Sequence, residues 1–184
     1  DGKAKFDIIM PGDLVHCDFG ITYLTLNTDC QELAYVLKPE ETDAPNFLKE
    51  ALKQGNEVQD ALTDNFKKGR TGNNTLKMAI ESSKNAGLRP QIYTHPLGLY
   101  GHSAGTTFGM WDAQYGIPGS GEHPLYENTT YAIELNAKVF IEQWGKDLRI
   151  MLEEPGYFGP EGFRYINGRQ TNLILIGEKS NHIR

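Results

Sequence analysis

Four β-like runs follow one another in the last third of the chain, with no helical pattern between them. They are TTYAIELNAKVFI (129–141), DLRIMLEE (147–154), FRYING (163–168) and TNLILIG (171–177). Strands joined by such short connections pair antiparallel, because a parallel crossover needs on the order of a dozen residues or more. Two further β-rich runs open the chain, LVHCDFG (14–20) and ITYLTLNTD (21–29), with Gly20 marking the bend between them.

Two helices are expected between these β-rich regions. Apolar residues recur at a roughly helical period over residues 47–66, in a segment that Gly69 can end. Asp43 can cap the start of this helix, and Pro45 suits its first turn. A second, shorter helix is predicted for residues 73–86.

The order of hairpin, helices and antiparallel strands predicts an α+β fold, and a length of 184 residues fits one domain spanning residues 1–184. The net charge is −6, and no cluster of basic residues exceeds a pair such as Lys67 and Lys68, which argues against a nucleic-acid surface. No apolar run reaches the length of a membrane span. We therefore expect a soluble protein without nucleic-acid or membrane partners, cytoplasmic or exported depending on residues upstream.

The opening hairpin brings two aspartates together. Because side chains alternate along a strand, a hairpin that turns at residues 23–24 sets Asp18 opposite Asp29. Like charges directly opposite each other are destabilising, so the pair needs either a bound cation or full solvation. The same register sets Cys17 opposite Cys30 on the other face, as two thiols or as a cross-strand disulfide.

Three more residues extend this set. His95 lies in YTHPLG, Glu134 in the otherwise apolar run YAIELN, and Glu153 at the end of LRIMLEE. An ionised carboxylate in an apolar strand is rarely buried unless it is paired or coordinated. Each residue alone could be an exposed acid or a packed histidine. Four carboxylates and one imidazole together suit two divalent cations that share carboxylate ligands.

The order of these residues resembles the pita-bread metallopeptidases, which include methionine aminopeptidases, Xaa-Pro aminopeptidases and prolidases. GDLVHCDFG…TD resembles the strand pair that carries two aspartate ligands. HPLGLYGH resembles the histidine-ligand loop, in which a second histidine, here His102, follows seven residues later. YAIELN and RIMLEEP resemble the segments with the two glutamate ligands. The similarity extends from about residue 10 to 177 and is greatest for Xaa-Pro aminopeptidase-like members.

The resemblance implies a pita-bread fold and hydrolysis of N-terminal peptide bonds, especially Xaa-Pro bonds, by a hydroxide formed between two metal ions. It also implies five metal ligands: Asp18, Asp29, His95, Glu134 and Glu153. Glu134 serves in addition as the general base, and His102 donates to the scissile carbonyl oxygen. An oxygen-dominated ligand set favours Mn²⁺, with Fe²⁺, Co²⁺ and Zn²⁺ as alternatives.

Several positions depart from the family pattern. Leu135 replaces the proline after the first glutamate, Ser103 replaces the acid after the second histidine, and Met151 replaces an arginine before the last glutamate. The helices that complete the first half of the relatives are also missing, so we expect a C-terminal portion of a longer protein. The alternative to a peptidase is therefore an inactive pita-bread domain that binds peptides or proteins. A homodimer is a candidate assembly, since Xaa-Pro-type relatives often dimerise.

Overall fold

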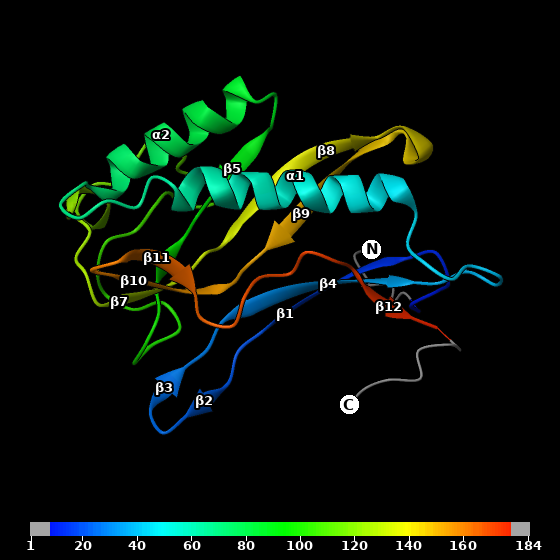
Figure 1. Ribbon diagram of the computed structural model, residues 1–184, viewed down its shortest axis with the longest axis horizontal. Helices are drawn as coiled ribbons and strands as arrows, with labels where there is room; N and C mark the ends of the chain where they lie inside the picture. The colour runs from blue at the N-terminus through cyan, green and yellow to red at the C-terminus, as the bar shows by residue number, and fades with distance from the viewer. Residues whose placement is uncertain (1–7, 178–184) are drawn as a thin grey trace, which may run out of the picture.

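The computed structural model describes residues 8–177 (Figure 1). Within this range the strands form four small sheets, with orders β1-β4-β12, β11-β10-β7-β6, β5-β8-β9 and β2-β3. The strands are β1 (Leu14–Phe19), β2 (Thr22–Tyr23), β3 (Leu26–Asn27), β4 (Cys30–Val36), β5 (Pro90–Ile92), β6 (His95–Pro96), β7 (Thr129–Ala132), β8 (Leu135–Ile141), β9 (Lys146–Leu152), β10 (Pro155–Gly159), β11 (Gly162–Tyr165) and β12 (Ile174–Ile176). The helices are α1 (Asn46–Thr63) and α2 (Gly72–Asn85), with 3₁₀ turns η1 (Ser120–Glu122) and η2 (Glu142–Trp144). Helices segregated from mainly antiparallel strands confirm the predicted α+β class.

Three segments of the chain pass from one sheet to another, and their crossing points lie along one line through the molecule. β5 leads into β6, β7 into β8 and β9 into β10, and each pair contributes one strand to each of two sheets. The breaks fall at residues 93–94, 133–134 and 153–154. The run predicted as β over 129–141 is therefore two strands, β7 and β8, and the run predicted over 147–154 is strand β9, which ends at Leu152. At the breaks the backbone bonds to the neighbouring run, as when Ile133 N–H donates to the Glu154 carbonyl oxygen at 2.9 Å.

Helix α1 packs along β8 and β9 and supplies much of the core (Figure 1). Leu48 and Leu62 are fully buried on its inner face, and burying each such side chain stabilises the fold by roughly 1.5–3 kcal/mol. Gly55 permits the close approach, because a Cβ there would lie 2.7 Å from Ile150 Cγ2 and 2.8 Å from Leu152 Cδ1. Neither helix in residues 8–177 is long and apolar enough to cross a bilayer.

The start of α1 differs from the expected cap. Its N-cap residue is Pro45, which makes no side-chain capping bond. Asp43 lies outside the helix, where Oδ1 accepts from Ala44 N–H at 2.7 Å and Oδ2 pairs with Lys49 Nζ at 2.7 Å. The aspartate thus stabilises the turn that leads into the helix instead of capping the helix itself.

The end of α1 comes at Thr63, six residues before the predicted stop at Gly69. The chain turns here and brings Phe66 into the core, where its ring stacks on Phe108 with centroids 5.0 Å apart. Burial of an aromatic ring is worth more than another helical turn. The second helix lies within one residue of its predicted range, as Gly72–Asn85.

The β1–β4 hairpin has a register that differs by two residues from the predicted one. Asp18 lies opposite Gln31, because the chain turns at Leu24 and Thr25 and not at residues 23–24. Both turn residues have positive φ, 47° and 70°, as a two-residue type I′ turn requires. Neither is the glycine or asparagine that usually marks such a turn in a sequence.

The register correction leaves the two faces of the hairpin unchanged, since only an odd shift exchanges them. Asp18 and Asp29 still share one face, now as diagonal neighbours. Cys17 and Cys30 share the other face, but Cys17 lies opposite Glu32 and both cysteines are free thiols.

Candidate metal centre

The two glutamates predicted as ligands lie at breaks between strands. Glu134 follows the end of β7, and Glu153 follows the end of β9, so neither lies inside a regular strand. Their side chains are 17% and 1% exposed. At a break the strict alternation of side chains is relaxed. Both carboxylates can therefore face the same point between the sheets while their apolar neighbours remain in the core.

The imidazole of His95, at the start of β6, faces both carboxylates. Its Nδ1 is 3.1 Å from the Pro96 carbonyl oxygen, which can only accept, so Nδ1 carries the proton. Nε2 then presents a lone pair 3.5 Å from Glu153 Oε1 and 3.6 Å from Glu134 Oε2. This tautomer is the one that can bind a metal through Nε2.

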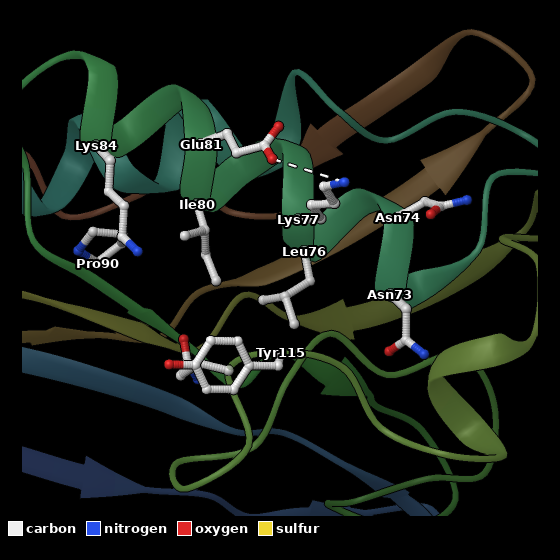
Figure 2. A pocket seen from close by; sticks show the side chains of 10 residues that line it. Asn73, Asn74, Leu76, Lys77, Ile80, Glu81, Lys84, Pro90 and Tyr115 are labelled. Carbon is white, nitrogen blue, oxygen red and sulfur yellow. Dashed lines mark ion pairs between the residues drawn. The ribbon is translucent and has the colours of Figure 1, made fainter.

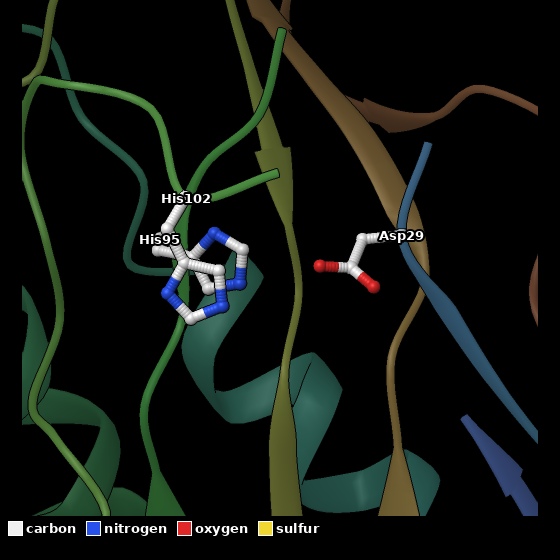
Figure 3. A group of neighbouring side chains, drawn as sticks. All are labelled: Asp29, His95 and His102. Atoms are coloured by element: carbon white, nitrogen blue, oxygen red, sulfur yellow. The ribbon is translucent and has the colours of Figure 1, made fainter. Parts of the chain in front are cut away.

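The hairpin completes the cluster. Asp18 comes from β1, and Asp29 immediately precedes β4. Candidate ligand atoms lie within 4.8 Å of one another in three overlapping groups: Asp18, Asp29, Glu153; His95, Glu134, Glu153; and Asp29, His95, His102. The structure thus brings together all five residues predicted as ligands, with His102 as a sixth. Figure 3 shows the Asp29 carboxylate facing the two imidazoles.

Burial and, after it, repulsion between carboxylates raise the pKa values of two acids in the cluster. Burial, followed by the charge of Glu153, raises the pKa of Glu134 to about 7 and that of Asp29 to about 6. Burial alone would lower the pKa of His95, but Glu153 and the Pro96 carbonyl oxygen outweigh it and leave that pKa above its usual value. Carboxylates crowded in this way favour any positive charge placed between them.

Two buried atoms test whether a metal fits. His95 Nε2 and Glu153 Oε1 find no hydrogen-bond partner among the described residues, although both are buried and face each other. An unsatisfied buried polar atom costs about 1–3 kcal/mol, more if charged. Divalent cations coordinated by imidazole nitrogen and carboxylate oxygen would satisfy both atoms. The carboxylates of Asp29 and Glu153 each belong to two of the three groups, and a carboxylate with two oxygens can bridge two adjacent cations.

His102 lies beside this cluster and is more exposed. Its ring stacks on His95 with centroids 3.9 Å apart and an interplanar angle of 22° (Figure 3). Burial and the neighbouring His95 lower the pKa of His102, which favours the neutral imidazole. A neutral imidazole at the rim can still donate one N–H to a bound molecule.

Glu153 and Glu154 face opposite ways. Glu154 Oε1 accepts the backbone N–H of Gln170 at 2.6 Å, away from the cluster. Burial raises the pKa of Glu154 to about 7. The geometry therefore agrees with the choice of Glu153 as the residue that faces the metal position.

Gln31 also belongs to the site, although it was not predicted from the sequence. It is 2% exposed on β4, and its Nε2 donates to Glu134 Oε1 at 2.8 Å and to Glu153 Oε2 at 3.1 Å. Its Oε1 lies 2.8 Å from His16 Nε2. The only available signal was its position two residues after Asp29, on the same strand face.

A pocket of about 450 Å³ opens beside the cluster. His95, His102 and Glu134 contribute to its wall, and its apolar lining includes Tyr93, Met110, Trp111 and Ile117. The long loop after Pro90 supplies most of this lining. Such a mixture of apolar surface and a few converging polar groups is typical of a small-ligand site.

A second pocket, of about 440 Å³, lies between α2 and the loop that carries Tyr115 (Figure 2). Leu76 and Ile80 line it from the helix. Asn73 at its edge is engaged with the backbone of Ile117 through both amide atoms. This pocket contains none of the clustered carboxylates or histidines.

Comparison with known families identifies the family of the chain. The model of metallopeptidase family M24 matches residues 2–159 of the chain. The chain belongs to this family. A comparison with curated proteins finds no significant match.

Solved structures share the fold. X-Pro aminopeptidase from Thermotoga maritima MSB8 is 21% identical, with 95% of this chain and 45% of that chain covered and a TM-score of 0.69. The prolidase from Pyrococcus horikoshii OT3 is 22% identical, with 93% and 44% covered and a TM-score of 0.65. Methionine aminopeptidase from Rickettsia prowazekii is 17% identical, with 84% and 64% covered and a TM-score of 0.60. The predicted pita-bread fold is thus confirmed, and this M24 chain spans less than half the length of the first two structures.

Proposed function

We propose that this chain is the catalytic portion of a metal-dependent aminopeptidase that hydrolyses N-terminal peptide bonds, with Xaa-Pro bonds as the preferred class. In this proposal residues 1–184 form one metallopeptidase-like domain of a longer protein. The observation that carries the proposal is the buried, unpartnered pair of His95 Nε2 and Glu153 Oε1, 3.5 Å apart among further carboxylates. Membership of a metallopeptidase family supports the same chemistry.

The metal ligands in this proposal are Asp18, Asp29, His95, Glu134 and Glu153. Four carboxylates balance the charge of two divalent cations, and their oxygen-rich character favours Mn²⁺ over Fe²⁺, Co²⁺ and Zn²⁺. When bound, such a pair of cations supplies Lewis acidity that lowers the pKa of water and polarises a carbonyl group.

Glu134 has the proton-transfer role. Its Oε2 faces the cluster, while its Oε1 accepts from Gln31 Nε2. A carboxylate held in this way can take a proton from the attacking water and deliver it to the departing amine nitrogen. Its partial burial keeps bulk water from competing for that proton.

His102 binds the substrate carbonyl. It stands at the rim of the cluster, stacked on His95, and in its neutral form offers one N–H to the oxygen on which negative charge develops. The adjoining pocket, with Met110 and Trp111 in its wall, can enclose the N-terminal side chain of the peptide. A peptide is therefore the proposed partner.

Metal analysis combined with peptide hydrolysis tests this function. We expect about two Mn²⁺ ions per chain and cleavage of an Xaa-Pro dipeptide or tripeptide. Glu134→Gln should lower kcat by roughly 10²–10⁴-fold, as expected for loss of a general base. Glu161→Gln is the matched control, because Glu161 is exposed and lies outside the cluster. Failure to bind metal under any loading condition would exclude the ligand assignment.

A binding module without catalysis is the second candidate. Ser103 supports it, since this residue replaces the acid that usually follows the second histidine. Its hydroxyl donates to the Tyr100 carbonyl oxygen at 2.9 Å and accepts the Tyr100 N–H at 3.2 Å, so it stabilises its own loop. Tight Mn²⁺ and peptide binding without turnover would favour this candidate over the peptidase.

A further inference from the structure

Gln31 makes a set of contacts that a packing role alone does not require. It is the one side chain within residues 8–177 that donates hydrogen bonds to Glu134 and Glu153. Both hydrogens of its amide nitrogen are used, one for each carboxylate. Its backbone N–H also donates to the Glu153 carbonyl oxygen at 3.0 Å, which joins β4 to the break after β9.

Gln31 contacts only one of the two carboxylate oxygens of each glutamate. Gln31 engages Oε1 of Glu134 and Oε2 of Glu153. The other two oxygens, Glu134 Oε2 and Glu153 Oε1, are the ones that lie 3.6 and 3.5 Å from His95 Nε2. One oxygen of each carboxylate is therefore fixed by the amide while the other points to the metal position.

The two glutamates determine the orientation of this amide, and His16 supports it. Ionised carboxylates only accept, so the amide nitrogen of Gln31 faces Glu134 and Glu153. Its Oε1 then faces His16 Nε2, 2.8 Å away, which donates to it in the matching tautomer. The half-buried histidine on β1 thus stabilises the orientation in which the amide hydrogens face the glutamates.

We propose that Gln31, supported by His16, is a positioning residue that holds Glu134 and Glu153 in the arrangement needed to bind metal, an inference that rests on the proposed function. A neutral amide suits this role because it orients two anions without adding a positive charge. A cation at the same place would compete with the metal ions for the carboxylates. Supporting partners of metal ligands typically contribute about 10–100-fold in metal affinity.

The test measures metal binding by the full chain, independently of hydrolysis. Gln31→Met keeps the length of the side chain but removes its donors, and it should weaken Mn²⁺ binding roughly 10–100-fold in calorimetry. The absorption spectrum of bound Co²⁺ should also change, because the carboxylates are no longer held in place. Gln59→Met is the matched control: Gln59 is fully buried on α1, and its amide has no hydrogen-bond partner in the described part of the chain. It should leave both readouts unchanged.

A second pair of variants keeps the test valid if Gln31→Met does not fold. His16→Ala removes the donor to Gln31 and should weaken Mn²⁺ binding by a smaller factor. His16→Gln restores a donor and should recover most of the affinity. If Gln31→Met folds and its Mn²⁺ affinity and Co²⁺ spectrum are unchanged, the positioning role is overturned. If only His16→Ala folds, an unchanged affinity and spectrum in that variant overturn it instead.

The outcomes separate this inference from the proposed function. A wild-type chain that binds no Mn²⁺ overturns both. A wild-type chain that binds Mn²⁺ but cleaves no Xaa-Pro peptide overturns the peptidase only, because the role of Gln31 is measured by binding.

Discussion

Two regions of the molecule contribute carboxylates to one site, and they differ in burial. The line of strand breaks contributes Glu134 and Glu153, whose side chains are 17% and 1% exposed. The β1–β4 hairpin contributes Asp18, which is exposed, and Asp29, which is half-buried. An exposed carboxylate is solvated with or without metal, whereas a buried one is not. The glutamates therefore create the requirement for a cation, and the aspartates complete its coordination.

Substitution of one carboxylate from each region should show this difference most strongly. Glu153→Gln should weaken Mn²⁺ binding by more than about 100-fold, beyond the effect of losing a supporting partner. In the metal-free state the same change should stabilise the fold, because it removes the negative charge that repels Glu134 and Asp29. Asp18→Asn should also weaken Mn²⁺ binding but shift metal-free stability by less than about 0.5 kcal/mol. Calorimetry measures Mn²⁺ affinity, and urea unfolding measures metal-free stability. Equal changes in the stability of the two variants would contradict the difference in burial between the two regions.

The pH dependence of the metal-free protein offers a second test. The pKa of Glu134 is raised from 4.5 to about 7, and that of Asp29 from 3.8 to about 6. The folded state holds these protons more tightly than the unfolded chain, so their stabilisation is full below pH 4 and is lost as pH rises through 6 to 7. We expect the free energy of unfolding to be lower at pH 8 than at pH 5 by on the order of 2 kcal/mol, about half of what the two pKa shifts alone would give, because solvent screens both partly exposed carboxylates.

Two controls sharpen this measurement. Glu134→Gln should remove part of the pH dependence, since the amide does not titrate. Saturating Mn²⁺ should reverse it, because bound metal favours the deprotonated carboxylates. A metal-free protein that is as stable at pH 8 as at pH 5 would show that the carboxylates are less crowded than their positions indicate.

The contact between α1 and β9 links the core to the buried half of the site. Gly55→Ala would place a Cβ 2.8 Å from Leu152 Cδ1, directly before Glu153. Overpacking costs about 1–3 kcal/mol, and the gain in helix propensity offsets at most about 1 kcal/mol of it. We expect a net loss of about 1–2 kcal/mol in urea unfolding, with weaker Mn²⁺ binding. Lys53→Ala, on the exposed face of α1, is the control, and an equal loss there would argue against a specific contact.

Much of this arrangement could be predicted from the sequence because the chemistry of the residues is unusual. A carboxylate such as Glu134 among apolar neighbours has few explanations, and the order of five such residues along the chain matched one family. The hairpin register was wrong by two residues, yet the face shared by Asp18 and Asp29 was right, since alternation depends only on parity.

The rest depends on tertiary structure. The breaks at residues 133–134 and 153–154 have no local signature, because YAIELN and RIMLEE read as continuous strands. They arise where the chain passes from one sheet to another. Gln31 was missed for a related reason: a glutamine has no charge to explain, and its two acceptors are 103 and 122 residues away in the chain.

Substitutions in the hairpin turn should have the smallest effect on stability, and they change only the exposed region of the molecule. Leu24 and Thr25 both adopt positive φ, which is unfavourable for residues with a branched or bulky side chain. Leu24→Asn combined with Thr25→Gly supplies the residues that a type I′ turn favours, and it should raise the free energy of unfolding by about 1 kcal/mol. Mn²⁺ affinity should stay unchanged, because the turn lies beyond Asp18 and Asp29 and the register is kept. A change in affinity without a gain in urea stability would mean that the turn conformation, and not only the strand register, positions the two aspartates.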